Sequence, residues 1–187
     1  MATACVKNQK NLPVRLMFQD EARFGRMSDP RACWAPVPKR PTVSLALVRE
    51  FRYEYAAVSP WVGQLDYMTS EKMNTENMSR FLNQVSETHE QEFMVMVLDG
   101  ASSHKCKELT VPENIALVLL PPYSPELNPA EQIWNVLRRD YFANRVFDSL
   151  NAATLQAENG LVRMASNRKA LKSLANWPWI NAILNAV

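Results

Sequence analysis

The chain has 187 residues, of which 47% are hydrophobic and 21% charged, so it is long enough to fold around a sizeable core. Its three widely spaced cysteines, Cys5, Cys33 and Cys106, suit a reducing compartment and argue against a disulfide framework or a zinc knuckle. The only two histidines, His89 and His104, are too few for a histidine-built metal site. The first residues lack the apolar core of a signal peptide, and no stretch approaches the ~18 apolar residues of a membrane helix. We therefore expect a cytoplasmic protein with no membrane partner.

The net charge of +2 is distributed unevenly along the chain. Residues 1–60 carry 10 basic and 5 acidic side chains, residues 61–131 carry 4 and 11, and residues 132–187 carry 7 and 3. The three segments therefore have net charges of +5, −7 and +4. Basic flanks around an acidic middle are consistent with nucleic acid bound through divalent cations. A solvated surface with a chance asymmetry explains this feature equally well.

Strands dominate the predicted first half of the chain. Residues 14–20 alternate between apolar and polar side chains, and an acid arrives where the strand should end. After a polar, proline-spaced stretch, residues 42–58 are rich in β-branched and aromatic types, interrupted by Arg49 and Glu50. This pattern predicts two strands joined by a tight turn, with a further strand near residues 64–68. These early strands can pair antiparallel.

Helices alternate with buried strands in the predicted second half. Residues 73–90 show the spacing of an amphipathic helix. Residues 93–99 and 115–120 are apolar on both faces, which is typical of strands in the middle of a covered sheet. Further helices are predicted from Asn128 through Tyr141, over residues 149–166 and over residues 169–175. The order of elements predicts an α/β fold with a mixed sheet covered by helices on both faces.

The chain shows no internal repeat, low-complexity tract or domain linker. We therefore expect residues 1–187 to form a single domain. Its core should span about residues 14–145, with a helical part over residues 146–187.

Three acidic side chains are expected to meet at one edge of the predicted sheet. Asp20 and Asp99 each end a predicted strand, the position from which side chains enter the crevice that open α/β sheets use for ligands. Glu131 lies in the first turn of the helix that follows the last buried strand. Clustered carboxylates repel one another, and a bound divalent cation is the usual way to keep them ionised. Oxygen ligands favour Mg²⁺ or Mn²⁺, and two such ions about 3.5–4 Å apart can clamp the reacting oxygens of a phosphoryl displacement.

Each of these acids also has a simpler structural explanation. Asp99 begins an Asp-Gly pair, a common hairpin turn, although the helix-forming residues that follow fit a hairpin poorly. Asn128 and Glu131 have the spacing of a capping box, in which the glutamate would only bond the backbone amide of Asn128. Asp20 could be a plain surface acid. The sequence leaves these alternatives open.

Other polar residues are weaker candidates for functional roles. His104 follows the second predicted acid and could lie near the metals or a phosphate, although an ordinary loop histidine is the simpler interpretation. His89 is interpreted as part of a solvated helix end. Six basic residues are candidates for DNA backbone contacts, with a solvated helix face as the alternative: Arg138, Arg139, Arg163, Arg168, Lys169 and Lys172. Trp134 is interpreted as a core residue.

Three segments of the chain resemble the catalytic core of the DDE transposases, specifically the mariner-like superfamily and its bacterial insertion-sequence branch. These segments are FQDEARFG, MVMVLDGASSHK and LLPPYSPELNPAEQIWNVLRRDY. The third is the most specific, because a proline-rich loop that leads through SPELNPAE into an aromatic-bearing helix is hard to obtain by chance. The resemblance spans about residues 14–180. It implies a ribonuclease H-like fold with a five-stranded mixed sheet, and a catalytic triad of Asp20, Asp99 and Glu131 that holds two Mg²⁺ or Mn²⁺ ions.

The resemblance also implies an activity, namely DNA transposition. The expected steps are hydrolytic nicking at transposon ends and attack of the freed 3′ hydroxyl on target DNA, usually at a TA dinucleotide. The expected location is the bacterial cytosol, with the protein on the nucleoid when it is bound to DNA. A catalytically silent DNA-binding or oligomerisation remnant of a transposase is the alternative function.

Two departures from the family pattern accompany this resemblance. Asp99 and Glu131 are 32 positions apart, slightly fewer than is usual, so we expect a trimmed connection between them. Members of the family also carry an N-terminal helix-turn-helix region that recognises transposon ends, and here the first predicted strand begins near residue 14. We therefore expect that region to be absent, with a homodimer or a separate DNA-binding polypeptide as partners. A split reading frame, a decayed copy and a fragment all fit this expectation.

Overall fold

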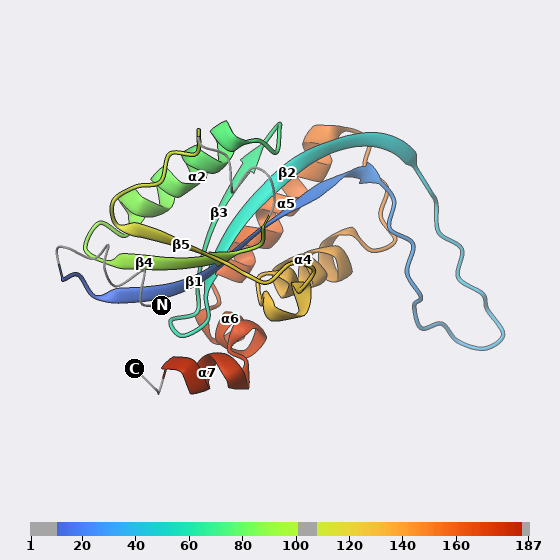
Figure 1. Cartoon of the computed structure of the whole chain (residues 1–187). Helices are drawn as coiled ribbons and strands as arrows, with labels where there is room; N and C mark the ends of the chain where they lie inside the picture. The colour runs from blue at the N-terminus through green and yellow to red at the C-terminus, as the bar shows by residue number, and fades with distance from the viewer. Residues whose placement is uncertain (1–10, 101–107, 185–187) are drawn as a thin grey trace.

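A computed structural model describes residues 11–100 and 108–184 of the chain. Within these ranges a five-stranded sheet has the strand order β3-β2-β1-β4-β5 (Figure 1). The first three strands along the chain pair antiparallel, and β1, β4 and β5 pair parallel. The strands are β1 (Val14–Met27), β2 (Leu47–Ser59), β3 (Gln64–Ser70), β4 (Phe93–Leu98) and β5 (Ile115–Leu119).

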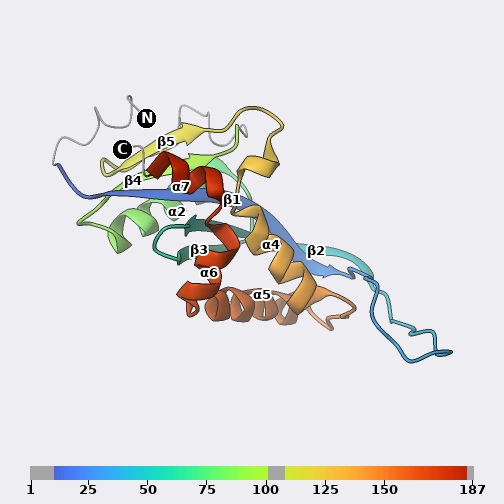
Figure 2. The ribbon, with the colours of Figure 1, turned by 90° about the horizontal axis from the view of Figure 1, so that it is seen from below.

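Helices cover both faces of this sheet, and this arrangement confirms the predicted fold class (Figures 1 and 2). Helix α2 (Thr75–Thr88) covers one face. The other face is covered by α4 (Glu131–Leu137) with its π-helical continuation η2 (Arg138–Phe142), α5 (Leu150–Ala165), α6 (Arg168–Ala175) and α7 (Pro178–Leu184). A single 3₁₀ turn, η1 (Pro125–Leu127), interrupts the proline-rich loop before α4. Among the described residues, no helix is both long and apolar enough to cross a bilayer.

Strand β4 lies between two hydrophobic clusters, which explains why its sequence is apolar throughout. Met94 and Met96 pack with α2 on one face, whereas Val97 packs against the cluster on the face of α4 and α5. Helix α2 begins at a capped end, because the Asn74 side chain accepts a hydrogen bond of 2.9 Å from the backbone amide of Asn77. The amphipathic face of this helix is fully buried, as the sequence spacing predicts.

The prediction of two short strands within residues 42–58 is wrong, because β2 is one continuous strand. Arg49 and Glu50 occupy the part of β2 that extends beyond the helical layers and are exposed. Glu50 forms a cross-strand ion pair of 3.1 Å with Arg26. Gly25 opposite allows β1 and β2 to approach closely there, since a Cβ atom on it would lie 1.9 Å from the Glu50 carbonyl oxygen. In the sequence, the charged pair Arg49 and Glu50 therefore resembled a turn, although both residues belong to the exposed part of one strand.

His89 is not a solvated residue, so that interpretation is also wrong. Its side chain is buried just after α2, with Nε2 3.0 Å from Asp66 Oδ2 and Nδ1 3.2 Å from Glu92 Oε2. Arg15 on β1 contacts both oxygens of Glu92 at 2.7 Å. This polar network joins α2, β3, β4 and β1 at the end of the sheet where β4 begins.

Candidate active site

Asp20 and Asp99 come from the two central parallel strands. The register pairs Phe18 with Val97, and continuing it by two residues places Asp20 beside Asp99. Strand β4 ends at Leu98, whereas β1 continues, so Asp20 lies within its strand at the point where its parallel neighbour ends. The two acids therefore emerge together, because adjacent strands are only about 4.8 Å apart. The predicted end of the first strand at Asp20 is wrong, because β1 continues to Met27. Asp20 and Asp99 still lie side by side, because β1 and β4 are neighbouring parallel strands.

Glu131 is brought to the same place by the loop that precedes α4. The Asn128 side chain is buried, and its Nδ2 donates a hydrogen bond of 3.0 Å to the backbone oxygen of Gln19. Its Oδ1 accepts one of 3.1 Å from the amide of Ala130. Asn128 thus joins the beginning of α4 to β1 at the residue before Asp20. The backbone amide of Asn128 donates to the oxygen of Pro125 at 2.9 Å, so the capping-box explanation of Glu131 is not supported.

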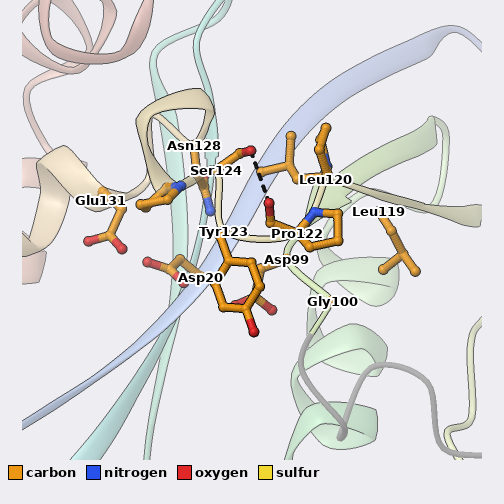
Figure 3. A pocket seen from close by; sticks show the side chains of 12 residues that line it. Asp20, Asp99, Gly100, Leu119, Leu120, Pro122, Tyr123, Ser124, Asn128 and Glu131 are labelled. Atoms are coloured by element: carbon orange, nitrogen blue, oxygen red, sulfur yellow. Dashed lines mark hydrogen bonds between the residues drawn. The ribbon is translucent and has the colours of Figure 1, made fainter.

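All three acids line one cavity of about 640 Å³ (Figure 3). Asp20 contributes from β1, Asp99 from the residue after β4, and Glu131 from the first turn of α4. The remaining wall comes from the end of β5 and the proline-rich loop, including Tyr123. Tyr123 is fully exposed and adopts a φ of 57°.

The electrostatic environment of Asp20 is strongly unfavourable to a negative charge. Burial, and second to it the neighbouring carboxylate of Glu131, raise the pKa of Asp20 from 3.8 to about 8. The Trp134 indole N–H opposes this shift by donating a hydrogen bond of 2.9 Å to Asp20 Oδ2. When both are ionised, these two carboxylates repel each other in a partly buried cavity, and a bound cation would reduce that repulsion.

The chemistry of these side chains fits a hard divalent ion. Their donor atoms are all carboxylate oxygens, the ligands that Mg²⁺ and Mn²⁺ prefer. Within residues 11–100 and 108–184, however, no group of three or more histidine, cysteine or acidic side chains is placed so that it could hold a metal ion. The three acids thus share a cavity in a more open arrangement than a complete coordination shell requires.

Of the other candidates from the sequence, the basic residues, Arg138 and Arg139 among them, are described by the structure, and none of them lines this cavity. His104 lies outside the described residues. The guanidinium of Arg138 is stacked over the ring of Phe24, with Cζ 5.4 Å from the ring centroid. Arg139 is held by the carboxylate of Asp140, at 2.6 and 2.8 Å. Both arginines therefore have partners within the fold.

A second cavity, of about 660 Å³, lies between η2 and α5. Its lining includes Arg145 and Arg163, for which the described part of the chain contains no acid at ion-pair distance. The one acid that lines it, Asp140, is already engaged by Arg139. This cavity therefore presents uncompensated positive charge on the helical side of the domain. Arg163 was one of several candidates from the sequence for DNA contacts, and Arg145 was not a candidate.

Two contacts at the first cavity were also not predicted. Trp134 was interpreted only as a core residue, and it is indeed 1% exposed, but its indole N–H reaches Asp20. Asn128 was interpreted only as a helix cap, yet it also bonds the strand that carries Asp20. A usable signal was present for Trp134, because it lies three residues after Glu131 and so on the same face of α4.

The sheet, its two helical layers and the acids beside the central strands define an α/β domain of the ribonuclease H-like class. Residues 15–153 match the family described as DDE superfamily endonuclease, and the chain belongs to this family. It is similar to the uncharacterized protein y4pE/y4sA of Sinorhizobium fredii, with 36% identity over 96 residues that cover 51% of this chain and 71% of the relative.

Solved transposase structures share the fold. The Mos1 strand transfer complex aligns with a TM-score of 0.64 and 13% identity, covering 94% of this chain and 54% of the Mos1 chain. The Mos1 mariner paired-end complex with Mn aligns with a TM-score of 0.56 and 16% identity, covering 87% and 56%. At these identities the likeness concerns the fold. The present chain spans about half the length of the Mos1 chains.

Proposed function

We propose that this domain cleaves DNA phosphodiesters and transfers DNA strands with divalent metal ions held by Asp20, Asp99 and Glu131. The observation that carries the proposal is the presence of these three acids in one cavity, beside the ends of the parallel strands. Membership of the DDE superfamily endonucleases supports it. The Mos1 structures include one with Mn and one with Mg, which supports the choice of ion.

The roles of the side chains follow from their positions. Asp20 and Asp99 would hold a metal from neighbouring strands, and Glu131 would close the site from α4. When bound, the ions supply charge neutralisation at the phosphate and lower the pKa of the attacking water or hydroxyl. The sheet and α4 supply position, because each acid sits on or beside a regular element rather than in the middle of a long loop. The open side of the cavity leaves room for a DNA strand.

We propose transposition as the biological reaction, with nicking at transposon ends followed by attack of the freed 3′ hydroxyl on target DNA. DNA is then the substrate, and synapsis of two ends favours a homodimer. The acidic cavity cannot attract DNA by charge unless cations are present, so DNA binding there should depend on the metal. Arg145 and Arg163 in the second cavity are candidates for contacts with the DNA backbone.

A plasmid-nicking assay tests the proposal. The chain should convert supercoiled plasmid to the nicked form with Mn²⁺ or Mg²⁺ and not with EDTA, and Asp99→Asn and Glu131→Gln should each abolish this conversion. Glu126→Gln is a matched control, because Glu126 is an exposed acid in the same loop that does not line the cavity. Wild type should also gain thermal stability with Mn²⁺ by mass action. Equal residual nicking by the wild type and both site variants would reject the enzymatic role and favour a catalytically silent remnant.

A further inference from the structure

We propose that Trp134 is a positioning residue for Asp20, an inference that rests on the metal-dependent function proposed above. Its indole N–H donates a hydrogen bond to Oδ2 of Asp20, and this bond sets how the carboxylate is turned within the cavity. The contact is short, at 2.9 Å, and Trp134 is 1% exposed, so water does not compete for it. An indole has a single donor and no acceptor, which makes the orientation of this hydrogen bond unambiguous.

The position of the indole is fixed by packing. Trp134 belongs to the hydrophobic cluster between the sheet and the helices on this face. The centroid of its ring lies 5.9 Å from that of Phe24. Phe24 follows Ala22 on β1 by two positions, so the two side chains are on the same face of the strand. A bulky side chain buried in this way has few alternative rotamers, so the N–H direction is set before any ligand arrives.

The same helix carries Trp134 and Glu131. The two residues are three positions apart on α4 and therefore face the same way. Because Trp134 is bonded to Asp20, the hydrogen bond links the helix that carries Glu131 to the side chain of Asp20. Asp20 and Glu131 repel each other when both are ionised, and a carboxylate with free rotation would turn away. The indole opposes that rotation.

This hydrogen bond predicts how Asp20 would bind a metal ion and how the affinity would change without the indole. Asp20 would offer Oδ1 to the ion more readily than Oδ2, because the Trp134 N–H already occupies one lone pair of Oδ2. The backbone of Glu21 also forms a hydrogen bond with the Asp20 carboxylate. Removing the indole N–H should therefore loosen the carboxylate without freeing it, and should weaken cation binding without removing any ligand. Loss of such a supporting hydrogen bond to a metal ligand typically weakens metal affinity by about 10-fold to 100-fold.

The test compares Trp134→Phe with Trp177→Phe by Mn²⁺ titration calorimetry. Trp177 is a matched control, because it packs against the same cluster and its indole N–H also donates a hydrogen bond, of 3.2 Å, but to the Leu174 oxygen. Trp134→Phe should weaken Mn²⁺ binding by about 10-fold, and Trp177→Phe should bind as wild type does. In wild type labelled with ¹⁵N at its five tryptophans, the indole signal that Trp134→Phe removes should be the one that Mg²⁺ shifts most.

Two outcomes separate the failure of this inference from the failure of the proposed function. If wild type binds Mn²⁺ and Trp134→Phe binds it equally, or the Trp134 indole signal does not move with Mg²⁺, the positioning role is refuted and the metal site remains. If wild type binds neither ion, both proposals fail. Should Trp134→Phe not fold, benzothienylalanine at position 134 keeps the bicyclic shape without the N–H, and it should show the same loss of affinity.

Discussion

Replacing Asp20 with asparagine should stabilise the metal-free domain at alkaline pH. Asparagine keeps the size of the side chain, and its oxygen can still accept the hydrogen bond from Trp134. The pKa of Asp20 is raised from 3.8 to about 8, first by burial and then by Glu131. Between pH 4 and pH 8, therefore, the folded state keeps a proton that the unfolded chain releases. The stability of the wild type falls as pH rises through this window and is constant above it.

The size of the effect follows from the pKa difference. One pKa unit corresponds to about 1.4 kcal/mol, so a shift of roughly four units sets a ceiling of about 6 kcal/mol on the gain at pH 9. Because the cavity is open to solvent, the effective dielectric is high and a gain of about 2 kcal/mol or more is the expected result. Domains of this size are stable by only about 5–15 kcal/mol, so even the smaller gain is readily measured. At pH 4 the two proteins should be equally stable.

Urea unfolding followed by circular dichroism, from pH 4 to pH 9 in EDTA, measures this difference. Adding Mg²⁺ should then stabilise the wild type and leave Asp20→Asn unchanged, because the charged acid is what the ion binds. Acids that do not interact with Asp20 contribute equally to both proteins and cancel in the comparison, whereas Glu131 loses a repelling neighbour in the variant. Parallel stability curves across the whole pH range would refute the claim that ionisation of Asp20 destabilises the folded state. An asparagine variant that is less stable than wild type at pH 9 would refute it as well.

Two further predictions concern residues outside the cavity. The pKa of Glu54 is raised from 4.5 to about 7, mainly by burial, so the wild type should lose stability as the pH rises between those values. In urea unfolding, Glu54→Gln should be about 2–3 kcal/mol more stable than the wild type above pH 7. Below pH 4 the two proteins should be equally stable. A variant without this gain would show that Glu54 is ionised at little cost. Neutralising Arg145 and Arg163 to glutamine should reduce the slope of log affinity for DNA against log salt by up to about 2, measured by fluorescence anisotropy. The control Arg52→Gln, whose arginine pairs with Glu71, should not change the slope, and an equal change in the control would exclude a local backbone contact.

The local pattern of the chain was sufficient for the fold class and for most elements. Buried strands such as β4 are apolar on both faces because helices cover both sides, and α2 shows its buried face in its spacing. Local patterns failed where distant residues set the outcome. Glu50 resembled a turn residue because its partner, Arg26, is on another strand. His89 resembled a solvated residue because the carboxylates that bury it come from β3 and from the residue just before β4.

The candidate site shows the same division. Residue types and spacing indicated that Asp20, Asp99 and Glu131 could lie together at one edge of the sheet. The family was indicated by the resemblance of the segments around them. The pairing of β1 with β4, and the bond between Asn128 and β1, are long-range contacts that bring those acids to one cavity. The bond from Trp134 to Asp20 spans 114 positions of the chain. No local pattern encodes such a contact, because it exists only after a strand and a helix that are far apart in the sequence have packed together.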